Sequence, residues 1–128
     1  TDNYWLRPNG LYDFSFRLLH EAHKWNFNSF KKACDNKLFF DNSERLIVVD
    51  NTNTTLKEIL PYAEEAHLNG IPVCLVYFKP KLSLEEIAKR NIHNVPLEVV
   101  QKQYNRIGYT MHEELIDYGI PCTFLFIE

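Results

Sequence analysis

Three short apolar runs punctuate this chain, and longer stretches with helical spacing separate them. The runs cover residues 45–49, 72–78 and 121–127, and they are rich in β-branched and aromatic residues. Runs of this length predict buried strands, whereas apolar positions three and four residues apart predict amphipathic helices. The predicted order is helix, strand, helix, strand, two helices, strand. Such alternation predicts an α/β fold, a parallel sheet with flanking helices.

Capping residues mark two of the predicted helices. Thr55 and Glu58 form a capping-box pattern at the start of a helix that ends near residue 70. Ser83 and Glu86 repeat the pattern at the start of a short helix that ends near residue 91.

Two further helices are predicted, from residue 15 to about 36 and from 96 to 119. Pro96 suits a first helical turn and Gly119 a helix end. The apolar face of the last helix comprises Leu97, Val100, Tyr104, Ile107, Met111 and Leu115.

Composition narrows the class of protein. A length of 128 residues predicts a single domain, residues 1–128, and a net charge of −3 gives no global reason to bind nucleic acid or membrane. No apolar run is long enough to span a membrane. We expect Cys34, Cys74 and Cys122 to be buried and reduced, in an intracellular protein of the cytoplasm or nucleus.

The segment after the first predicted strand carries polar side chains. Asp50, Asn51 and Asn53 follow residues 45–49, and ligands bind at the carboxyl ends of strands in open parallel sheets. These side chains either bind phosphate, ribose or hydrated Mg²⁺, or organise the turn and cap the next helix. The sequence leaves both readings open.

Two other segments carry groups suited to chemistry. Asp2, followed by Tyr4 and Arg7, can hold a hydroxyl substrate and accept its proton, unless this is only a solvated terminal loop. Arg90 lies in a connector between helices and can clamp phosphate through its planar guanidinium, unless the connector is a solvated hinge.

Other site types have little support. His20 and His23 lie about one helical turn apart, but no third zinc ligand is evident, and a packed or hydrogen-bonded helix pair explains them better. The glycines are scattered, and neither GxxxxGK[ST] nor GxGxxG occurs. We predict no metal-binding residues in this chain.

Residues 1–5, 49–53 and 88–96, taken in order, resemble segments of the P-loop kinase family. That family includes the polynucleotide kinases and the kinase-like domain of Nedd4-binding proteins. The resemblance covers residues 1–104, and residues 21–26 and 61–62 add to it. It implies a three-layer fold and ATP-dependent phosphoryl transfer to a nucleic-acid or nucleoside hydroxyl.

The resemblance also assigns roles. Asp2 falls on the proton acceptor and Arg90 on the lid arginine, which together form the implied catalytic pair. Lys89, Arg90 and Asn91 fall on the segment that contacts ATP. The implied substrate-binding residues are Tyr4, Arg7, His23, Asp50, Asn51 and Asn53. ATP and Mg²⁺ are the implied cofactors, and nucleic acid is an implied partner.

One part of the family pattern is missing, because its first strand and phosphate-binding loop have no counterpart in this sequence. That strand belongs between the strands at residues 45–49 and 72–78. We expect either a second polypeptide segment to fill this gap or those two strands to pair directly. The chain alone is not expected to be an active enzyme. The alternative is a non-catalytic pseudokinase that binds nucleic acid or protein.

Two geometric expectations follow. The three strands should lie parallel in one sheet. Asp2, Asp50 and Arg90 should meet in one cleft at the carboxyl ends of the strands.

Overall fold

The computed structural model describes residues 2–35 and 46–128. The chain divides into two compact units, Thr1–Asn51 and Thr52–Glu128, and each is described by itself. The single domain expected over residues 1–128 stays a prediction. None of the helices in the described ranges is both long and apolar enough to cross a membrane. The intracellular location stays a prediction.

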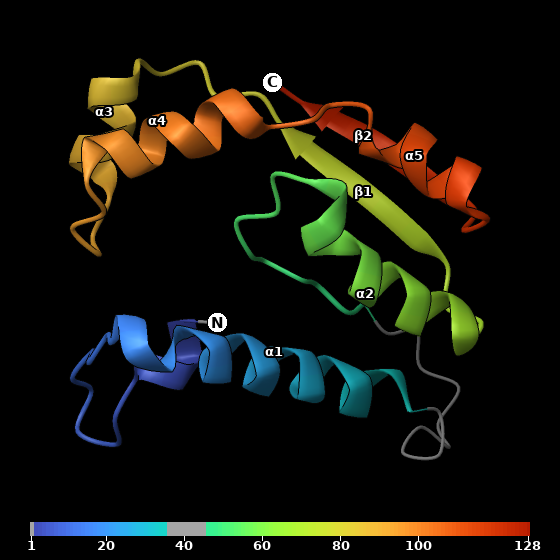
Figure 1. The fold of residues 1–128 in the computed structure, drawn as a ribbon, viewed down its shortest axis with the longest axis horizontal. Helices are drawn as coiled ribbons and strands as arrows, with labels where there is room; N and C mark the ends of the chain where they lie inside the picture. The colour runs from blue at the N-terminus through green and yellow to red at the C-terminus, as the bar shows by residue number, and fades with distance from the viewer. Residues whose placement is uncertain (1, 36–45) are drawn as a thin grey trace. The chain divides into compact units, whose positions relative to one another are not determined.

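The first unit contains two 3-10 helices and one long helix (Figure 1). They are η1 (Asp2–Trp5), η2 (Phe16–Leu18) and α1 (Leu19–Cys34). Between η1 and η2 the chain turns back, because Leu6 forms an antiparallel bridge with Tyr12 and Gly10 has a φ of 80°. The helix predicted from residue 15 is confirmed, with a 3-10 first turn, and its expected end lies outside the described residues.

Aromatic packing holds η1 in place. Trp5 is buried, and its ring lies 4.9 Å from the Tyr4 ring and 5.1 Å from the Phe14 ring. Aromatic pairs at these separations stabilise a small unit beyond the area that they bury.

The strand predicted at residues 45–49 is wrong for the part that the structure describes. Residues 46–50 form neither strand nor helix, and Leu46 and Val48 are 88% and 71% exposed. A strand needs a neighbour to satisfy its backbone groups, and no described strand pairs with this segment. Arg45 lies outside the described residues.

The second unit contains a two-stranded parallel sheet. Strands β1 (Val73–Phe78) and β2 (Cys122–Ile127) pair in register from Val73 beside Cys122 to Phe78 beside Ile127. The α/β prediction of a parallel sheet with flanking helices is therefore confirmed. The expected third strand is not found in this sheet among the described residues. The three-layer fold of the P-loop kinases stays a prediction.

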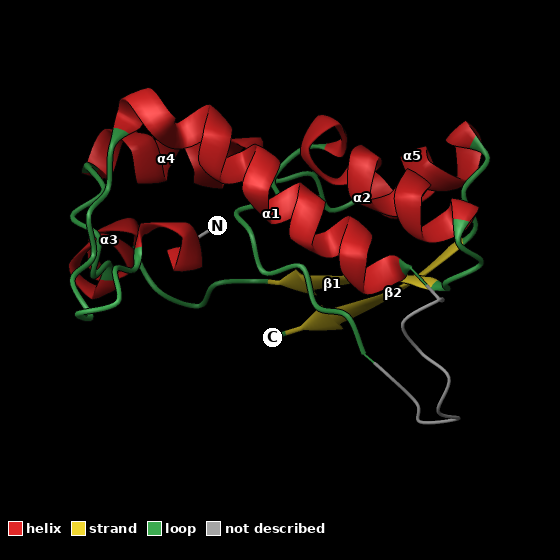
Figure 2. Ribbon diagram, turned by 90° about the horizontal axis from the view of Figure 1, so that it is seen from below, coloured by secondary structure: helices red, strands yellow, loops and turns green. Residues whose placement is uncertain are grey.

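Helices α2 (Leu56–Leu68) and α5 (Met111–Tyr118) cover one face of this sheet (Figure 2). The capping box predicted at the start of α2 is confirmed. The core between the helices and the strands consists of Ile59, Ala63, Tyr77, Met111, Leu115 and Ile120.

The other sheet face is open within this unit. Side chains alternate between faces along a strand, so Cys74 lies on the face opposite the core residue Tyr77. Cys74 is exposed, Cys122 is half-buried and Cys34 is buried. The expected burial of Cys74 was therefore wrong, because neither α2 nor α5 covers its face.

The single helix predicted over residues 96–119 is also wrong. It is two helices, α4 (Leu97–Arg106) and α5, separated at residues 107–110. Ile107 leaves the helical conformation with a ψ of 115°, and the Gly108 N–H donates to the Thr54 carbonyl over 3.1 Å. A tertiary hydrogen bond thus replaces a helical one, and Leu97 and Tyr104 are exposed rather than part of the core.

Helix α3 (Leu84–Arg90) packs beside α4 (Figure 1). The Ser83 hydroxyl accepts the Glu86 N–H over 3.3 Å, while the Glu86 carboxylate accepts the Ser83 N–H over 2.9 Å. This is the predicted second capping box, and the predicted end of α3 near residue 91 is confirmed.

Candidate functional site

Asp2 presents an exposed carboxylate at the start of η1. The Tyr12 hydroxyl, brought close by the Leu6–Tyr12 bridge, donates to Asp2 Oδ1 over 3.5 Å. Burial raises the pKa of Tyr12, and the Asp2 charge raises it further. Tyr12 therefore remains neutral and can donate to the Asp2 carboxylate.

Tyr4 and Arg7 are both engaged inside the first unit. The Tyr4 hydroxyl donates to Glu21 over 3.4 Å, and burial followed by the Glu21 charge raises the pKa of Tyr4. Arg7 forms an exposed ion pair with Asp13 across the turn. Arg7 thus braces the turn, and a substrate would have to compete with Asp13 for its guanidinium.

His23, Asp50 and Asn51 come from the same unit. The Asn26 side-chain amide donates to Asn51 Oδ1 over 3.3 Å, which ties the segment at residue 51 to α1. Asp50 and His23 are exposed. This contact anchors the segment at Asn51, and both sequence readings of Asp50 and Asn51 stay open.

Hydrogen bonds of the next residue, Thr54, hold the turn that carries Asn53. Thr54 is 4% exposed, and its N–H and hydroxyl donate to Glu58 Oε2 over 2.7 and 3.0 Å. Arg106 adds Nε to the Thr54 hydroxyl oxygen at 3.1 Å and Nη2 to Glu58 Oε1 at 3.2 Å. Thr54, Glu58 and the distant Arg106 thus hold the backbone segment that carries Asn53.

The electrostatics of this cluster favour the charged carboxylate. Burial alone would raise the pKa of Glu58, but hydrogen bonds from Thr54 and Thr55, together with the Arg106 charge, lower it below its ordinary value. The capping-box pattern identified Glu58 from the sequence. Nothing in the sequence identified Arg106, because its partners lie about fifty residues away and no local pattern records them.

Lys89 and Arg90 lie in the last turn of α3, and both side chains are exposed. No described residue forms an ion pair with either of them. Asn91 Oδ1 accepts the His93 N–H over 2.9 Å, and Asn94 has a φ of 54°, so the connector is an ordered turn. The two cations are therefore available to an anion such as a phosphate.

A buried Tyr77–His112 pair was missed in the sequence. The Tyr77 hydroxyl oxygen accepts the His112 N–H over 2.9 Å and lies 3.1 Å from His112 Nδ1. The His112 ring stacks on Phe124 at 3.8 Å. The hydrogen bond from the His112 N–H to Tyr77 ties the first turn of α5 to strand β1, so the Tyr77–His112 pair stabilises the core.

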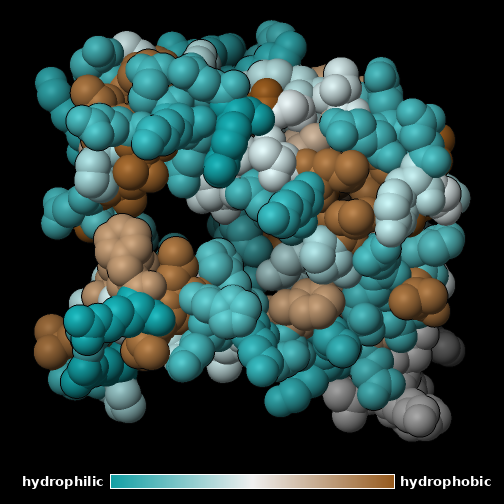
Figure 3. Space-filling view, viewed as in Figure 1, coloured by the Kyte–Doolittle hydropathy of each residue, from teal (hydrophilic) through white to brown (hydrophobic). Residues whose placement is uncertain are grey.

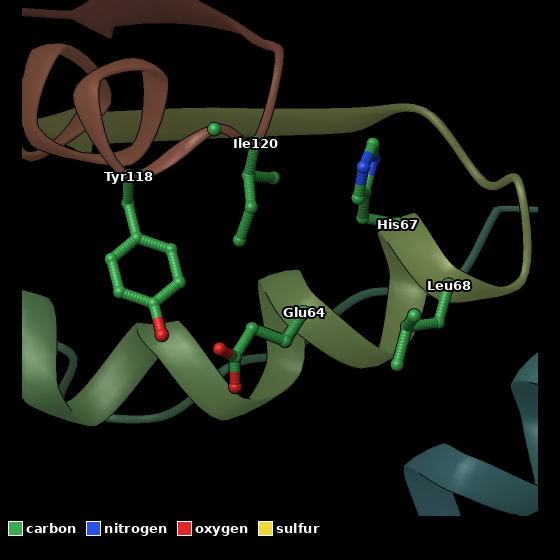
Figure 4. A pocket seen from close by; sticks show the side chains of 6 residues that line it. Glu64, His67, Leu68, Tyr118 and Ile120 are labelled. Atoms are coloured by element: carbon green, nitrogen blue, oxygen red, sulfur yellow. The ribbon is translucent and has the colours of Figure 1, made fainter.

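No predicted site residue lines the two hollows that are described here. Glu64, His67, Leu68, Tyr118, Gly119 and Ile120 line one hollow, with Tyr118 directed toward Glu64 (Figure 4). The hydrogen bond and charge of Glu64 raise the pKa of Tyr118. A second hollow shares Gly119 and adds Ile116, Pro121 and Cys122. Both hollows lie near the amino-terminal ends of β1 and β2, whereas parallel sheets bind ligands at the carboxyl ends of their strands.

The predicted site residues divide between the two units. The first unit holds Asp2, Tyr4, Arg7, His23, Asp50 and Asn51, and the second holds Asn53, Lys89, Arg90 and Asn91. The expected meeting of Asp2, Asp50 and Arg90 in one cleft stays a prediction. The roles assigned to all these residues stay predictions too.

The implied cofactors of this chain are ATP and Mg²⁺. Lys89 and Arg90 supply cationic groups suited to the phosphates of ATP. Residues 2–35 and 46–128 contain no group of three His, Cys, Asp or Glu side chains that could hold a metal ion. Mg²⁺ usually keeps several waters and binds through only one or two carboxylates together with phosphates, so ATP and Mg²⁺ both stay predictions.

Comparisons with known proteins support the resemblance in part. No protein-family model matches the chain, and no solved structure matches it. The chain is 36% identical over 108 residues to NEDD4-binding protein 2 of Homo sapiens. The match covers 80% of this chain and only 6% of that protein's length. The expected similarity to Nedd4-binding proteins is therefore confirmed.

Proposed function

We propose that this chain is the carboxyl-terminal part of a P-loop kinase-like domain. The domain would transfer a phosphoryl group from ATP to a hydroxyl of a nucleic acid or nucleoside. The observation that carries the proposal is the parallel β1–β2 pair, in which β1 has no strand on its other side within the described residues. A strand followed by a phosphate-binding loop fits that edge, and this sequence has no such loop.

The chain's own residues supply the remaining groups in this proposal. The exposed Asp2 carboxylate, oriented by Tyr12, accepts the proton of the attacking hydroxyl. Lys89 and Arg90 hold phosphate oxygens through charge-assisted hydrogen bonds. Similarity to NEDD4-binding protein 2 along 80% of the chain supports this assignment. The absent loop would supply ATP phosphate contacts, so the chain alone is expected to be inactive.

The test uses the longer gene product. We extend the chain at its amino terminus by the preceding residues, roughly 30 for a strand, loop and helix unit. Phosphoryl transfer is measured with ATP, Mg²⁺ and a 5′-hydroxyl oligonucleotide. We expect multiple turnovers from the extended chain and none from the 128-residue chain. Asp2→Asn in the extended chain should lower the rate about 10²–10⁴-fold, the usual contribution of a general base.

Asn9→Asp is a matched control, since it also exchanges an amide and a carboxylate in the exposed part of the first unit. It should leave the rate unchanged. Full activity in the Asp2→Asn variant would contradict the proton-acceptor role. Multiple turnovers by the 128-residue chain would contradict the need for a further segment.

A second candidate is a non-catalytic module that binds nucleic acid or protein. The sequence lacks GxxxxGK[ST], and the similar human protein is named for binding NEDD4. An extended chain that is folded and binds a partner but transfers no phosphate would favour this candidate.

A further inference from the structure

The charge of this chain is unevenly distributed. Residues 17–34 contain Arg17, Lys24, Lys31 and Lys32 and only one acid, Glu21, which gives a formal charge of +3. The whole chain carries −3, so all the other residues together carry −6. A local basic segment in an acidic chain indicates a partner of negative charge.

Three of these cations share one side of α1 and its entry turn. We call Arg17, His20, Lys24, Phe27 and Lys31 the basic stripe. They follow one another at intervals of three and four residues, which places them along one helix face. Phe27 is half-buried and the other four are exposed. Hydrophilic side chains cover much of α1 in the view of Figure 3.

The cations of the stripe are not neutralised within the described residues. None of the described carboxylates forms an ion pair with Arg17, Lys24 or Lys31. The Lys31 ammonium instead lies 5.8 Å from the centre of the Phe27 ring. The stripe therefore presents charge that an anionic ligand can neutralise.

Other residues of α1 make its contacts inside the unit. Glu21 accepts from Tyr4, Trp25 lies 5.9 Å from the Tyr4 ring, and Asn26 donates to Asn51. Ala22 is fully buried. Phe27 packs on Phe30 with ring centres 6.4 Å apart, while Arg17, Lys24 and Lys31 take no part in the contacts named above.

Exposed rings adjoin the cations. Phe16 precedes Arg17 and is 78% exposed, and its ring meets Phe14 edge-on at 4.9 Å. Cations that track a phosphate backbone beside rings that stack on bases are the recognition chemistry of single-stranded nucleic acid. A duplex hides its base faces, which leaves no ring for Phe16 to stack on.

We infer that the basic stripe, together with Phe16, binds single-stranded nucleic acid. Arg17, Lys24 and Lys31 contact phosphates, and Phe16 stacks on a base. The inference rests on the proposed function and deepens it, because it names a single-stranded nucleic acid rather than a free nucleoside as the bearer of the hydroxyl.

The test measures binding by the 128-residue chain without ATP. Fluorescence anisotropy follows a short labelled single-stranded oligonucleotide at salt concentrations from about 50 to about 200 mM. Charge reversal of Arg17, Lys24 and Lys31 to Glu should reduce the slope of log K against log salt by about 2, since each lost phosphate contact removes about 0.7. Reversal of exposed Lys57, Lys81 and Lys102 to Glu changes net charge equally and should leave most of the slope intact.

The ring is tested separately. Phe16→Ala should weaken binding about 5-fold to 140-fold, the loss expected for one stacked base of about 1–3 kcal/mol. Phe78→Ala removes an exposed ring from β1 and should leave binding unchanged. Circular dichroism of each variant checks that the helix content of the chain is unchanged.

Several results would overturn the inference. The inference fails if the chain does not bind the oligonucleotide at about 50 mM salt. It also fails if the two charge reversals weaken binding equally, or if duplex DNA or anionic vesicles bind as tightly or more tightly. Binding as inferred, without phosphoryl transfer by the extended chain, would overturn only the proposed function. Transfer to a nucleoside with wild-type binding by the stripe variants would overturn only this inference.

Discussion

A single carboxylate, Glu58, links the turn after Asn53 to α2 and α4. Its pKa is lower in the folded chain than the ordinary 4.5, so its charge stabilises the fold above that value. This stabilisation is lost as the pH falls through the lowered folded pKa. Glu58→Gln should therefore unfold at lower urea concentration than wild type near neutral pH, and the difference should shrink below pH 4.5. Glu85→Gln, at an exposed position on α3, is the control. A difference that stays constant with pH would contradict the role of the charge.

Residue-level sequence reasoning succeeded where partners are close in the chain. The Thr55–Glu58 and Ser83–Glu86 capping boxes were predicted because each spans three residues. Arg106 was not identified, since its contact with Thr54 joins residues 52 positions apart in the sequence. Arg90 and Asp2 were singled out by local pattern and resemblance, and their placement in separate units leaves their joint role a prediction.

At the scale of elements, two glycines give a matched pair of substitutions. Gly119 ends α5 with a φ of 101°, a conformation that costs other residues about 1–2 kcal/mol. Gly108 separates α4 from α5 at negative φ, and an added Cβ there would meet Met111 at an ordinary 3.5 Å. Gly119→Ala should therefore lose about 1–2 kcal/mol of unfolding free energy, and Gly108→Ala much less. Urea denaturation followed by circular dichroism measures both, and equal losses would contradict this assignment.

Element prediction was accurate for capped helices and paired strands and poor elsewhere. Strands β1 and β2 were predicted from their apolar runs, and in the structure one side of each strand packs on α2 and α5. The run at residues 46–49 is equally apolar, but no described strand pairs with it. Apolar character alone does not show whether a neighbouring strand exists. The break between α4 and α5 depends on the Gly108–Thr54 hydrogen bond, which helical periodicity does not reveal.

At the scale of the molecule, the second unit contains a two-stranded parallel sheet that helices cover on one face. Parallel sheets are normally covered on both faces, and a two-stranded sheet is marginal by itself. Here Val76, Phe78, Leu125 and Ile127 are exposed on the face opposite α2 and α5. This exposure, together with the bare edge of β1, supports the proposal that a further segment completes the sheet.

Hydrogen exchange at β1 tests this central claim most directly. The Lys79 N–H donates to the Ile127 carbonyl, so the N–H groups of Leu75 and Tyr77 also point toward β2. Those of Val76 and Phe78 point to the bare edge. In the 128-residue chain we expect fast exchange at Val76 and Phe78 and slow exchange at Leu75 and Tyr77. In the amino-terminally extended chain all four should exchange slowly. Fast exchange at Val76 and Phe78 in a folded extended chain would contradict the claim that a strand pairs with this edge.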